Sequence, residues 1–395
     1  MAITSERTAS PSAQNDKRLM LLEVRDLKVE FNIRGGSIKA VDGLTFDIKQ
    51  GQTVGIIGES GCGKSVTARA ILRMIPKPGK ITNGDILFYR YPKQGSHFTS
   101  QSEVVDMSKL DPDGSVVRQI RGGEIAMIFQ EPMSSLTPVY TAGTHINEAV
   151  SLHRMLPLKK LGDQMADKIM QYRNVTKEEA REIAVQMLRR VGIPKPEQRV
   201  NSYPHQLSGG QRQRVMIAVA LSTEPAMLIA DEPTTALDVS IEAQILEIMK
   251  DLQQSANMAI MFITHNLGVI ASMADEIVVM YMGKAVERAK VDDLFHNAKH
   301  PYTQALLRSI PKITERNASG RLASIEGMVP DPLHLPTGCV FHPRCPAFMP
   351  GRCDKIVPRW TKVGENQYVN CLLYEDGIQP DQASGTHQPQ TKAGA

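Results

Sequence analysis

The residues best placed to do chemistry form a glycine-rich loop, Gly58-Glu59-Ser60-Gly61-Cys62-Gly63-Lys64-Ser65. The loop fits the pattern G-x-x-x-x-G-K-[ST], in which backbone N–H groups point inward at phosphates. Lys64 would reach the β- and γ-phosphates of a nucleotide, and the Ser65 hydroxyl would hold Mg²⁺. An apolar run at 54–57 precedes the loop, and apolar residues at helical spacing follow it. This strand–loop–helix context predicts a nucleotide site.

Further apolar runs end in polar residues that phosphate chemistry can use: Ile125–Phe129 before Gln130, Met227–Ala230 before Asp231 and Glu232, and Ala259–Ile263 before Thr264 and His265. Near-continuous apolar runs of this length favour strands that are buried on both faces of a parallel sheet. Ligands bind beyond the carboxyl ends of such strands. We therefore expect these polar residues to converge on Lys64.

Charge and reach suggest a role for each residue at these strand ends. Asp231 would hold Mg²⁺ directly or through water, and Glu232 would orient and deprotonate the attacking water. Gln130 would contact both metal and water, and His265 would contact the γ-phosphate and the water. Taken singly, each has a structural alternative as a turn residue, a loop histidine or a cap before Pro233. Their joint occurrence favours the catalytic interpretation.

A second phosphate-facing element, Leu207-Ser208-Gly209-Gly210-Gln211, lies at the expected start of a helix. It would expose backbone N–H groups and the positive end of the helix dipole. Because the chain already has a phosphate loop, we expect this element to serve the nucleotide of a partner chain. The alternative is an ordinary serine N-cap followed by glycine in a turn.

In this order the motifs make the chain resemble an ATP-binding-cassette (ABC) ATPase over about residues 20 to 290. The resemblance assigns the family's named motifs as follows: Walker A, Gly58–Ser65; Walker B, Met227–Glu232; signature, Leu207–Gln211; Q-loop, Gln130; D-loop, Ala236–Asp238; switch histidine, His265. It implies a head-to-tail dimer, with each ATP between one chain's Walker A loop and the other chain's signature. Ser208 and Gly210 would then act on the partner's nucleotide. It also implies that Phe31 stacks on adenine, although Phe31 fits the apolar face of a strand equally well.

A narrower resemblance lies beyond the cassette, in His300-Pro301-Tyr302-Thr303 followed by Ala305-Leu306-Leu307. This segment is similar to the C-terminal extension of the oligopeptide/dipeptide/nickel importer ATPases. The run Gln130–Pro138 is also typical of them, although they usually have Asn where Thr137 stands. The resemblance implies a second ATPase chain of a different sequence, two transmembrane permease subunits and an extracytoplasmic substrate-binding protein. In the family, the permeases dock at the Q-loop region and the helical subdomain.

The cargo implied by this resemblance is peptides, with nickel or oligosaccharides as alternatives. A remote alternative is a soluble cassette ATPase that acts on DNA or ribosomes, or an exporter ATPase. Soluble cassettes generally have a long coiled coil or two cassettes in one chain, and this chain has neither. The His300–Thr303 segment argues against an exporter.

Four late cysteines, Cys339, Cys345, Cys353 and Cys371, lie among prolines and glycines, as a ligand set on irregular backbone would. Thiolates suit a [4Fe–4S] cluster or a structural zinc, but the absence of a C-x2-C pair weakens the zinc interpretation. Disulfides are disfavoured in a reducing compartment. Importer ATPases with this spacing resemble iron–sulfur carriers, which favours the cluster; free buried cysteines are the remaining alternative. We interpret Cys62, in the phosphate loop, as a small filler.

The predicted fold class is α/β: a P-loop NTPase with a RecA-like parallel core and an N-terminal antiparallel β subdomain. Its expected parts are a disordered tail at 1–18, the ATPase domain at 19–290 with a helical subdomain inserted at about 135–220, an extension with the four-cysteine metal site at 291–376, and a disordered tail at 377–395. Thr176 and Glu179 predict a capping box that starts one helix of the subdomain. A polar insertion between Phe88 and Arg121 is expected to form a surface loop.

The net charge of +4 and the pI of about 8.7 make the chain mildly basic. This suits work beside an anionic membrane but is too weak to indicate nucleic-acid binding. No apolar run is long enough to span a bilayer, and the N-terminus lacks a signal-peptide core. We therefore expect a peripheral protein on the cytoplasmic face of the cell membrane.

Overall fold

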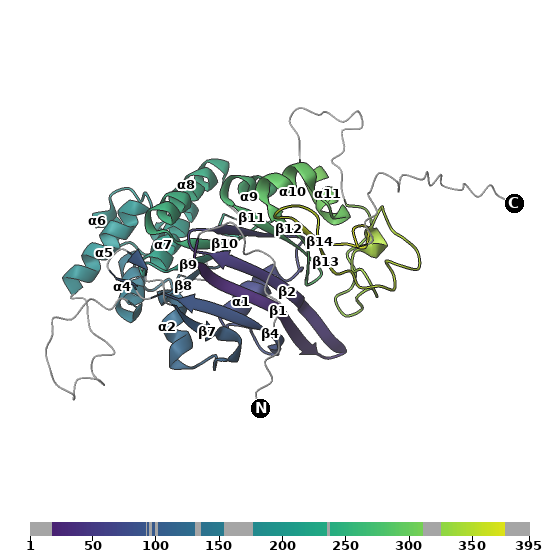
Figure 1. Cartoon of the computed structure of the whole chain (residues 1–395). Helices are drawn as coiled ribbons and strands as arrows, with labels where there is room; N and C mark the ends of the chain where they lie inside the picture. The colour runs from purple at the N-terminus through teal and green to yellow at the C-terminus, as the bar shows by residue number, and fades with distance from the viewer. Residues whose placement is uncertain are drawn as a thin grey trace.

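A mixed sheet of eight strands carries the fold in the computed structural model of the chain (Figure 1). The structure describes residues 18–91, 93–94, 97–98, 102–130, 136–153, 177–234, 238–310 and 325–375. The predicted tails, Thr176 of the capping box, residues 131–135 after the Q-loop glutamine and residues 236–237 of the D-loop lie outside these ranges.

The centre of this sheet is parallel, as predicted. Its neighbouring strands are β11 (Glu276–Tyr281), β3 (Thr53–Ile57), β10 (Ala259–Ile263), β9 (Met227–Asp231) and β8 (Ile125–Ile128). Every residue of β3, β9 and β10 is buried. Their apolar sequences are therefore explained by contacts on both faces, and their carboxyl ends lie at one edge of the sheet.

The C-terminal extension joins the same sheet through antiparallel strands. β12 (Lys284–Lys290) pairs with β11, and β14 (Tyr368–Asn370) pairs with β12 and with β13 (Trp360–Lys362). The buried carboxylate of Glu287 strengthens this junction, because it accepts hydrogen bonds from the backbone N–H groups of Lys299 and His300 and from Gln367 Nε2. The extension is thus bonded directly to the core sheet.

A second, antiparallel sheet contains the N-terminal strands in the order β2 (Gly36–Lys49), β1 (Met20–Ile33), β4 (Gly79–Arg90) and β7 (Glu103–Asp106). Its apolar face shares a core with α1 (Lys64–Ile71) and with the large sheet. This is the predicted antiparallel subdomain.

The expectation of a surface loop between Phe88 and Arg121 was wrong. β7 pairs with residues 87–90 of β4, and η1 (Met107–Lys109) and α2 (Ser115–Gly123) follow it. β5 (Lys93–Gln94) and β6 (His97–Phe98) form a short ribbon between β4 and β7. Met107, Val117 and Ile120 are buried. The few apolar residues of this segment stand among polar ones, so the local composition does not indicate that they are buried.

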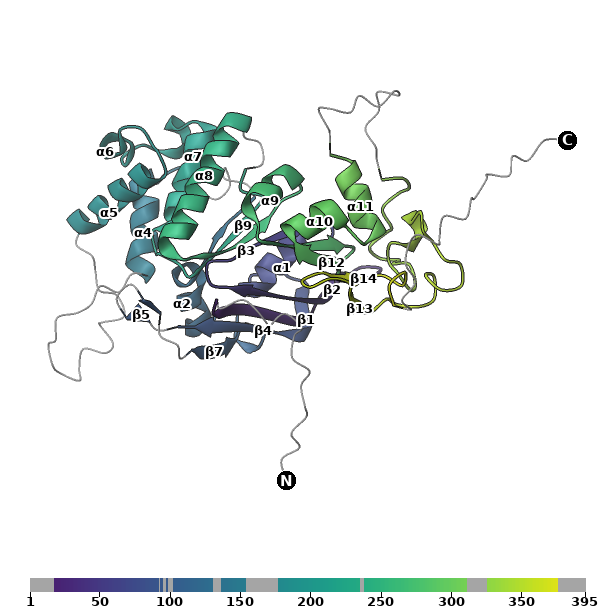
Figure 2. The ribbon, with the colours of Figure 1, turned by 45° about the horizontal axis from the view of Figure 1, so that its top comes forward.

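Helices gather at both ends of the large sheet (Figures 1 and 2). One group contains α4 (Ala142–His153), α5 (Lys177–Arg190), α6 (Pro196–Arg199), η3 (Pro204–Gln206), α7 (Gly209–Leu221) and α8 (Val239–Ala256). One face of α5 is buried at Ala184, Met187 and Leu188, and Val191 directly after the helix is buried as well. At the other end lie α9 (Leu267–Met273), α10 (Val291–Asn297), α11 (Pro301–Arg308) and the extension with η4 (His342–Arg344).

Membrane-spanning helices are not found in the part of the chain that the structure describes, since none of its helices has the necessary length and apolar character.

Candidate functional site

The phosphate loop joins β3 to α1, and its glycines are required by close packing. A Cβ atom at Gly58, where φ is +153°, would lie 2.2 Å from the carbonyl oxygen of Met280. A Cβ atom at Gly63, where φ is +102°, would lie 2.2 Å from the carbonyl oxygen of Ala40. Any larger residue would therefore have to move backbone that belongs to other strands.

Lys64 points into this loop. Its side chain is buried, and its Nζ donates to the carbonyl oxygens of Gly58 at 2.8 Å and Glu59 at 3.0 Å. The neighbouring Cys62 thiol is buried, and burial raises its pKa, so it is neutral at ordinary pH. Phosphate oxygens are the natural replacement for the two carbonyl partners of Lys64.

Ser65 and Asp231 come together from distant parts of the chain. Ser65 Oγ donates to Asp231 Oδ1 at 3.0 Å, and Asp231 ends β9 with a side chain that is almost fully buried. Burial raises the pKa of Asp231, against the opposing effect of the Ser65 hydrogen bond. A hydroxyl and a carboxylate oxygen at this separation fit the oxygen ligands that Mg²⁺ prefers.

Glu232 lies between the other two predicted catalytic residues. Gln130 Nε2 donates to Glu232 Oε2 at 3.0 Å, and His265 Nδ1 lies 3.3 Å from Glu232 Oε1. The neighbouring strands β8, β9 and β10 bring these residues to one sheet edge. Glu232 also has a positive φ of 48°, which is uncommon for a residue with a side chain and is often found at functional sites. The structure thus brings Gln130, Glu232 and His265 together at the strand ends, while their approach to Lys64 and their catalytic roles stay predictions.

The signature segment forms the N-terminus of α7. Ser208 Oγ accepts from the Gln211 N–H at 3.3 Å, and Gln211 Oε1 accepts from the Ser208 N–H at 3.1 Å, so the two residues form a capping box. Gly210 packs on Ile241 of α8, where a Cβ atom would approach to 2.9 Å. Ser208 and Gly209 are exposed, and a Cβ atom at Gly209 would meet open space. In the single chain the N-cap description holds; the contact with a partner's nucleotide stays a prediction.

Two further predicted nucleotide contacts have structural partners in this chain. The half-buried ring of Phe31 covers Gly79, where a Cβ atom would lie 2.5 Å from the ring. Asp238 caps α8, because its Oδ1 accepts from the Ile241 N–H at 2.9 Å. Adenine stacking by Phe31 and a nucleotide role for Asp238 therefore stay predictions.

Cys339, Cys345, Cys353 and Cys371 line one small cavity, with a volume of about 10 Å³. Burial raises the pKa of the Cys345 and Cys371 thiols to about 12 and also raises the pKa of Cys339. Among the described residues, no group of three or more His, Cys, Asp or Glu side chains is placed to hold a single metal ion. The thiols thus surround a common space without meeting at one point.

His300 lines the same cavity and carries an unsatisfied polar atom. Its Nδ1 accepts from the Tyr302 N–H at 3.0 Å, while its buried Nε2 has no hydrogen-bond partner among the residues that the structure describes. Burial lowers the pKa of His300 to about 3, so the neutral ring carries its proton on Nε2. A buried N–H of this kind needs an acceptor. Four thiols and this N–H are donors of the kind that an iron–sulfur cluster takes, but a volume of about 10 Å³ is the space of a single water-sized atom.

Contacts of Glu59 within the phosphate loop were not predicted from the sequence. The Glu59 N–H donates to Tyr302 Oη at 2.9 Å, and Arg344 donates to the Glu59 carboxylate at 2.8 and 3.2 Å. The sequence singles out His300–Thr303 as a family marker and gives no role to Arg344. The residues around Arg344 contain no pattern that predicts a contact with Glu59, which lies 285 residues earlier in the chain.

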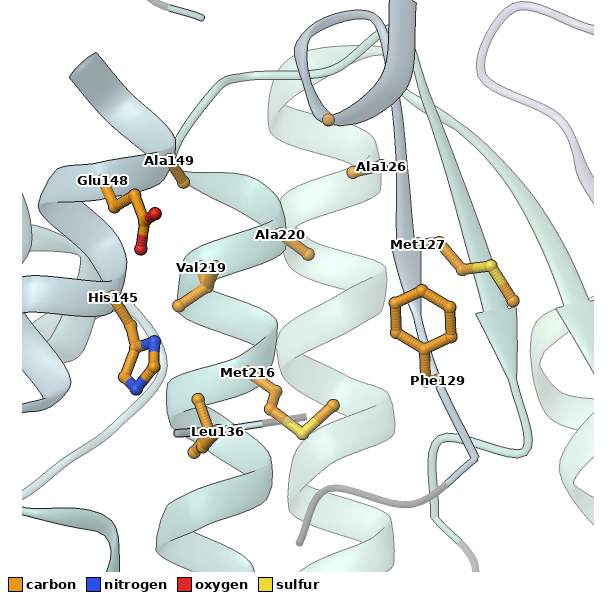
Figure 3. Close-up of a pocket in the computed structure, with 11 residues that line it drawn as sticks. Ala126, Met127, Phe129, Leu136, His145, Glu148, Ala149, Met216, Val219 and Ala220 are labelled. Carbon is orange, nitrogen blue, oxygen red and sulfur yellow. The ribbon is translucent and has the colours of Figure 1, made fainter. Parts of the chain in front are cut away.

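A groove of about 310 Å³ borders the Q-loop side of the sheet (Figure 3). His145, Glu148 and Ala149 of α4 lie on one wall, facing Met216, Val219 and Ala220 of α7. The rest of the wall contains Gly122, Ala126, Met127, Phe129 and Leu136. The groove is mainly apolar and connects the helical group to the strand that ends near Gln130.

Known proteins match both parts of the chain. The family model described as "ABC transporter" matches residues 41–235, and that described as "Oligopeptide/dipeptide transporter, C-terminal region" matches residues 286–353. The oligopeptide transport ATP-binding protein AppD of Bacillus subtilis (strain 168) is 46% identical, covering 90% of this chain and 97% of its own. The dipeptide transport ATP-binding protein DppD of the same organism is 40% identical, covering 92% and 98%.

Among solved structures, a dimeric post-hydrolysis state of the ATP-binding cassette MJ0796, bound to ADP and Pi, is similar in fold. It is 26% identical, with a TM-score of 0.54, and covers 69% of this chain and 99% of its own.

Proposed function

This chain belongs to the ABC transporter family of ATP-binding proteins, in its oligopeptide/dipeptide branch, and from that premise we propose how it drives peptide import. It is the ATP-hydrolysing subunit of a peptide importer that depends on a binding protein. The observation that carries the mechanism is the position of Glu232 between Gln130 and His265, beside the Ser65–Asp231 pair.

Hydrolysis in this centre proceeds by positioning and charge. Glu232 accepts the proton of the attacking water, and Gln130 and His265 hold the Glu232 carboxylate in place from either side. Lys64 and the N–H groups of the phosphate loop bind the β- and γ-phosphates. Ser65 and Asp231, with Gln130, would hold Mg²⁺, which neutralises phosphate charge.

The exposed signature supplies the other half of each ATP site. Ser208, Gly209 and Gly210 present helix N-terminal N–H groups to the ATP bound by a partner chain, and Gln211 maintains the cap. Asp238 lies near the same interface, and Phe31 contacts adenine. The partner is a second cassette, of a different sequence, and ATP draws the two together; the similar MJ0796 cassette is dimeric. Hydrolysis then lets them separate.

The groove between α4, α7 and β8 receives a helix of the permease. Its apolar lining suits an amphipathic helix, and its position next to the Gln130 strand links that helix to the catalytic centre. Two permeases bound to two cassettes would open the peptide path alternately to the two sides of the membrane. The cassettes would lie at the cytoplasmic face of the membrane. Ala149→Trp should fill the groove and reduce co-purification of the permeases, whereas unchanged co-purification would remove the assignment.

The cysteine cavity holds a [4Fe–4S] cluster, with zinc as the alternative. The four thiols line one space, thiolates are the ligands that such clusters take, and His300 offers an N–H to a sulfur atom. The walls of the cavity, whose volume is about 10 Å³, would have to move apart to admit the group. When bound, the group cross-links irregular backbone. Iron, sulfide and zinc analysis of anaerobically purified protein, with its visible spectrum, decides between them.

Peptide uptake into proteoliposomes tests the function as a whole. The chain, its partner ATPase, the permeases and the binding protein would be reconstituted with labelled peptide, and Glu232→Gln would be the matched inactive variant. We expect ATP-dependent accumulation of the peptide and none of the corresponding free amino acids. ATP hydrolysis without peptide accumulation would contradict the proposed cargo, and uptake unaffected by Glu232→Gln would contradict the mechanism.

A further inference from the structure

Glu59 of the phosphate loop is held by two elements from beyond the cassette. Its backbone N–H donates to the hydroxyl of Tyr302 in α11, and its carboxylate pairs with the guanidinium of Arg344 at the end of η4. Figures 1 and 2 show α11 and the extension together at one end of the molecule. The main chain and the side chain of one loop residue are thus both fixed from outside.

Arg344 is itself held firmly. Its side chain is only 4% exposed. Its remaining N–H groups donate to the carbonyl oxygens of Ile325 at 3.3 Å and Glu326 at 3.1 Å and to Tyr281 Oη at 3.3 Å. With two parallel bonds to Glu59, the pair has the bidentate geometry that makes arginine–carboxylate contacts strong.

An aromatic cluster supports this contact. The rings of Tyr281, Tyr302 and Phe341 lie within 4.7 to 5.3 Å of one another, and all three are buried. Tyr281 ends the core strand β11, Tyr302 belongs to α11, and Phe341 belongs to the extension. The cluster therefore leaves little freedom for Arg344 and Tyr302 to move relative to the sheet.

Glu59 carries a negative charge in the loop that must receive a polyphosphate. Its backbone carbonyl oxygen is 3.0 Å from Lys64 Nζ, so Glu59 adjoins the lysine that we propose to bind the phosphates, while its carboxylate faces Arg344. An uncompensated carboxylate here would repel nucleotide, because charges a few ångströms apart in a partly buried site interact strongly. Arg344 supplies the compensating charge.

We propose that Arg344 is a positioning residue for the ATP site, which neutralises Glu59 and fixes the phosphate loop so that nucleotide affinity depends on the cysteine-bearing extension. Arg344 directly precedes Cys345, and its N–H donates to the Phe341 carbonyl two residues after Cys339. Whatever orders the cysteine cavity therefore also places the guanidinium. The inference rests on the proposed phosphate role of Gly58–Ser65.

A double-mutant cycle on the full chain tests this inference. The dissociation constant for MgATP would be measured for the wild type, Arg344→Gln, Glu59→Gln and the double variant, with KM and kcat for hydrolysis. We expect Arg344→Gln to raise the dissociation constant and KM about tenfold, while kcat at saturating ATP changes less than about twofold. In chains that also carry Glu59→Gln, the Arg344→Gln step should change affinity less than about twofold.

Controls separate this effect from a general loss of structure. Lys355→Gln removes a positive charge from an exposed position of the same extension and should leave the ATP dissociation constant unchanged. Arg344→Lys keeps the positive charge but cannot form the two parallel hydrogen bonds to Glu59, so its ATP affinity should lie between those of the wild type and Arg344→Gln. An equal loss with and without Glu59→Gln, or no loss in Arg344→Gln, would overturn the inference. Failure of the wild type itself to bind ATP would instead overturn the proposed function.

Discussion

The catalytic centre around Glu232 and the cysteine cavity around His300 differ in how completely the protein satisfies their polar groups. Lys64, Ser65 and Gln130 all form hydrogen bonds within the chain. In the cavity, His300 Nε2 has none among the described residues, and burial holds the neighbouring thiols protonated. The proposed catalytic residues are thus hydrogen-bonded to one another, whereas the cysteine cavity keeps a buried N–H without an acceptor among the described residues.

The backbone beneath each centre explains this difference. Glu232, Gln130 and His265 follow neighbouring strands whose ladder of hydrogen bonds fixes their ends. The cysteines lie outside helices and strands, and one backbone bond between them runs from the Cys339 N–H to the Cys353 carbonyl at 2.8 Å. Irregular backbone of this kind is stable when a ligand cross-links it.

The largest expected effect is in the catalytic centre. Glu232→Gln removes the base but keeps the contacts of an amide, so ATP hydrolysis should fall about 100-fold or more while ATP stays bound. Phosphate release and retention of labelled ATP on gel filtration measure the two quantities. Glu247→Gln, at an exposed position of α8, is the matched control. Normal turnover in Glu232→Gln would show that another residue is the base.

The next largest effect is expected in the cysteine cavity. Cys345→Ser removes one of the four ligands, so bound metal should fall to about a tenth of the wild-type content or less. Cys62→Ser is the matched control, because Cys62 is buried in the phosphate loop away from the cavity. Iron and zinc analysis after anaerobic purification measures the result. Full metal content in Cys345→Ser would separate the cysteine from the site.

Substitution of His300 should have a smaller effect on metal retention, because His300 would contact the proposed cluster only through a hydrogen bond. His300→Phe preserves a ring in the cavity wall but removes the Nε2 donor, so metal release to a chelator should accelerate about tenfold. His300→Gln, which keeps an N–H, should release metal at a rate between those of the wild type and His300→Phe. The exposed control His296→Phe should release metal at the wild-type rate. Equal release rates in all of these chains would contradict the donor role.

The smallest effect concerns the contact that joins the two centres. Tyr302→Phe deletes the hydroxyl that accepts the Glu59 N–H, so ATP affinity should fall about fivefold, the equivalent of one hydrogen bond. Titration with a fluorescent ATP analogue measures it. Unchanged affinity would leave Arg344 as the sole link between extension and loop.

Much of the catalytic centre could be predicted from the sequence, because strand periodicity and motif spacing report the fold of a parallel sheet directly. The positions of Gln130, Asp231 and His265 at strand ends follow from the apolar run before each of them, while their catalytic roles stay predictions. The strand β7 was missed because Val104 and Val105 stand among polar residues. Arg344 was missed because a contact across 285 residues depends on packing that no local pattern encodes.

Hydrogen–deuterium exchange of the full chain, before and after an anaerobic treatment that removes the proposed cluster, tests the contrast between the two centres most directly. Without nucleotide, the amides of β9 and β10 should keep their protection, while those around Cys339–Cys345 and Cys353 should exchange at least about tenfold faster after removal. Residues 58–63 should also lose protection, through Arg344 and Glu59. Unchanged exchange around the cysteines, or an equal loss in β9 and β10, would contradict the account.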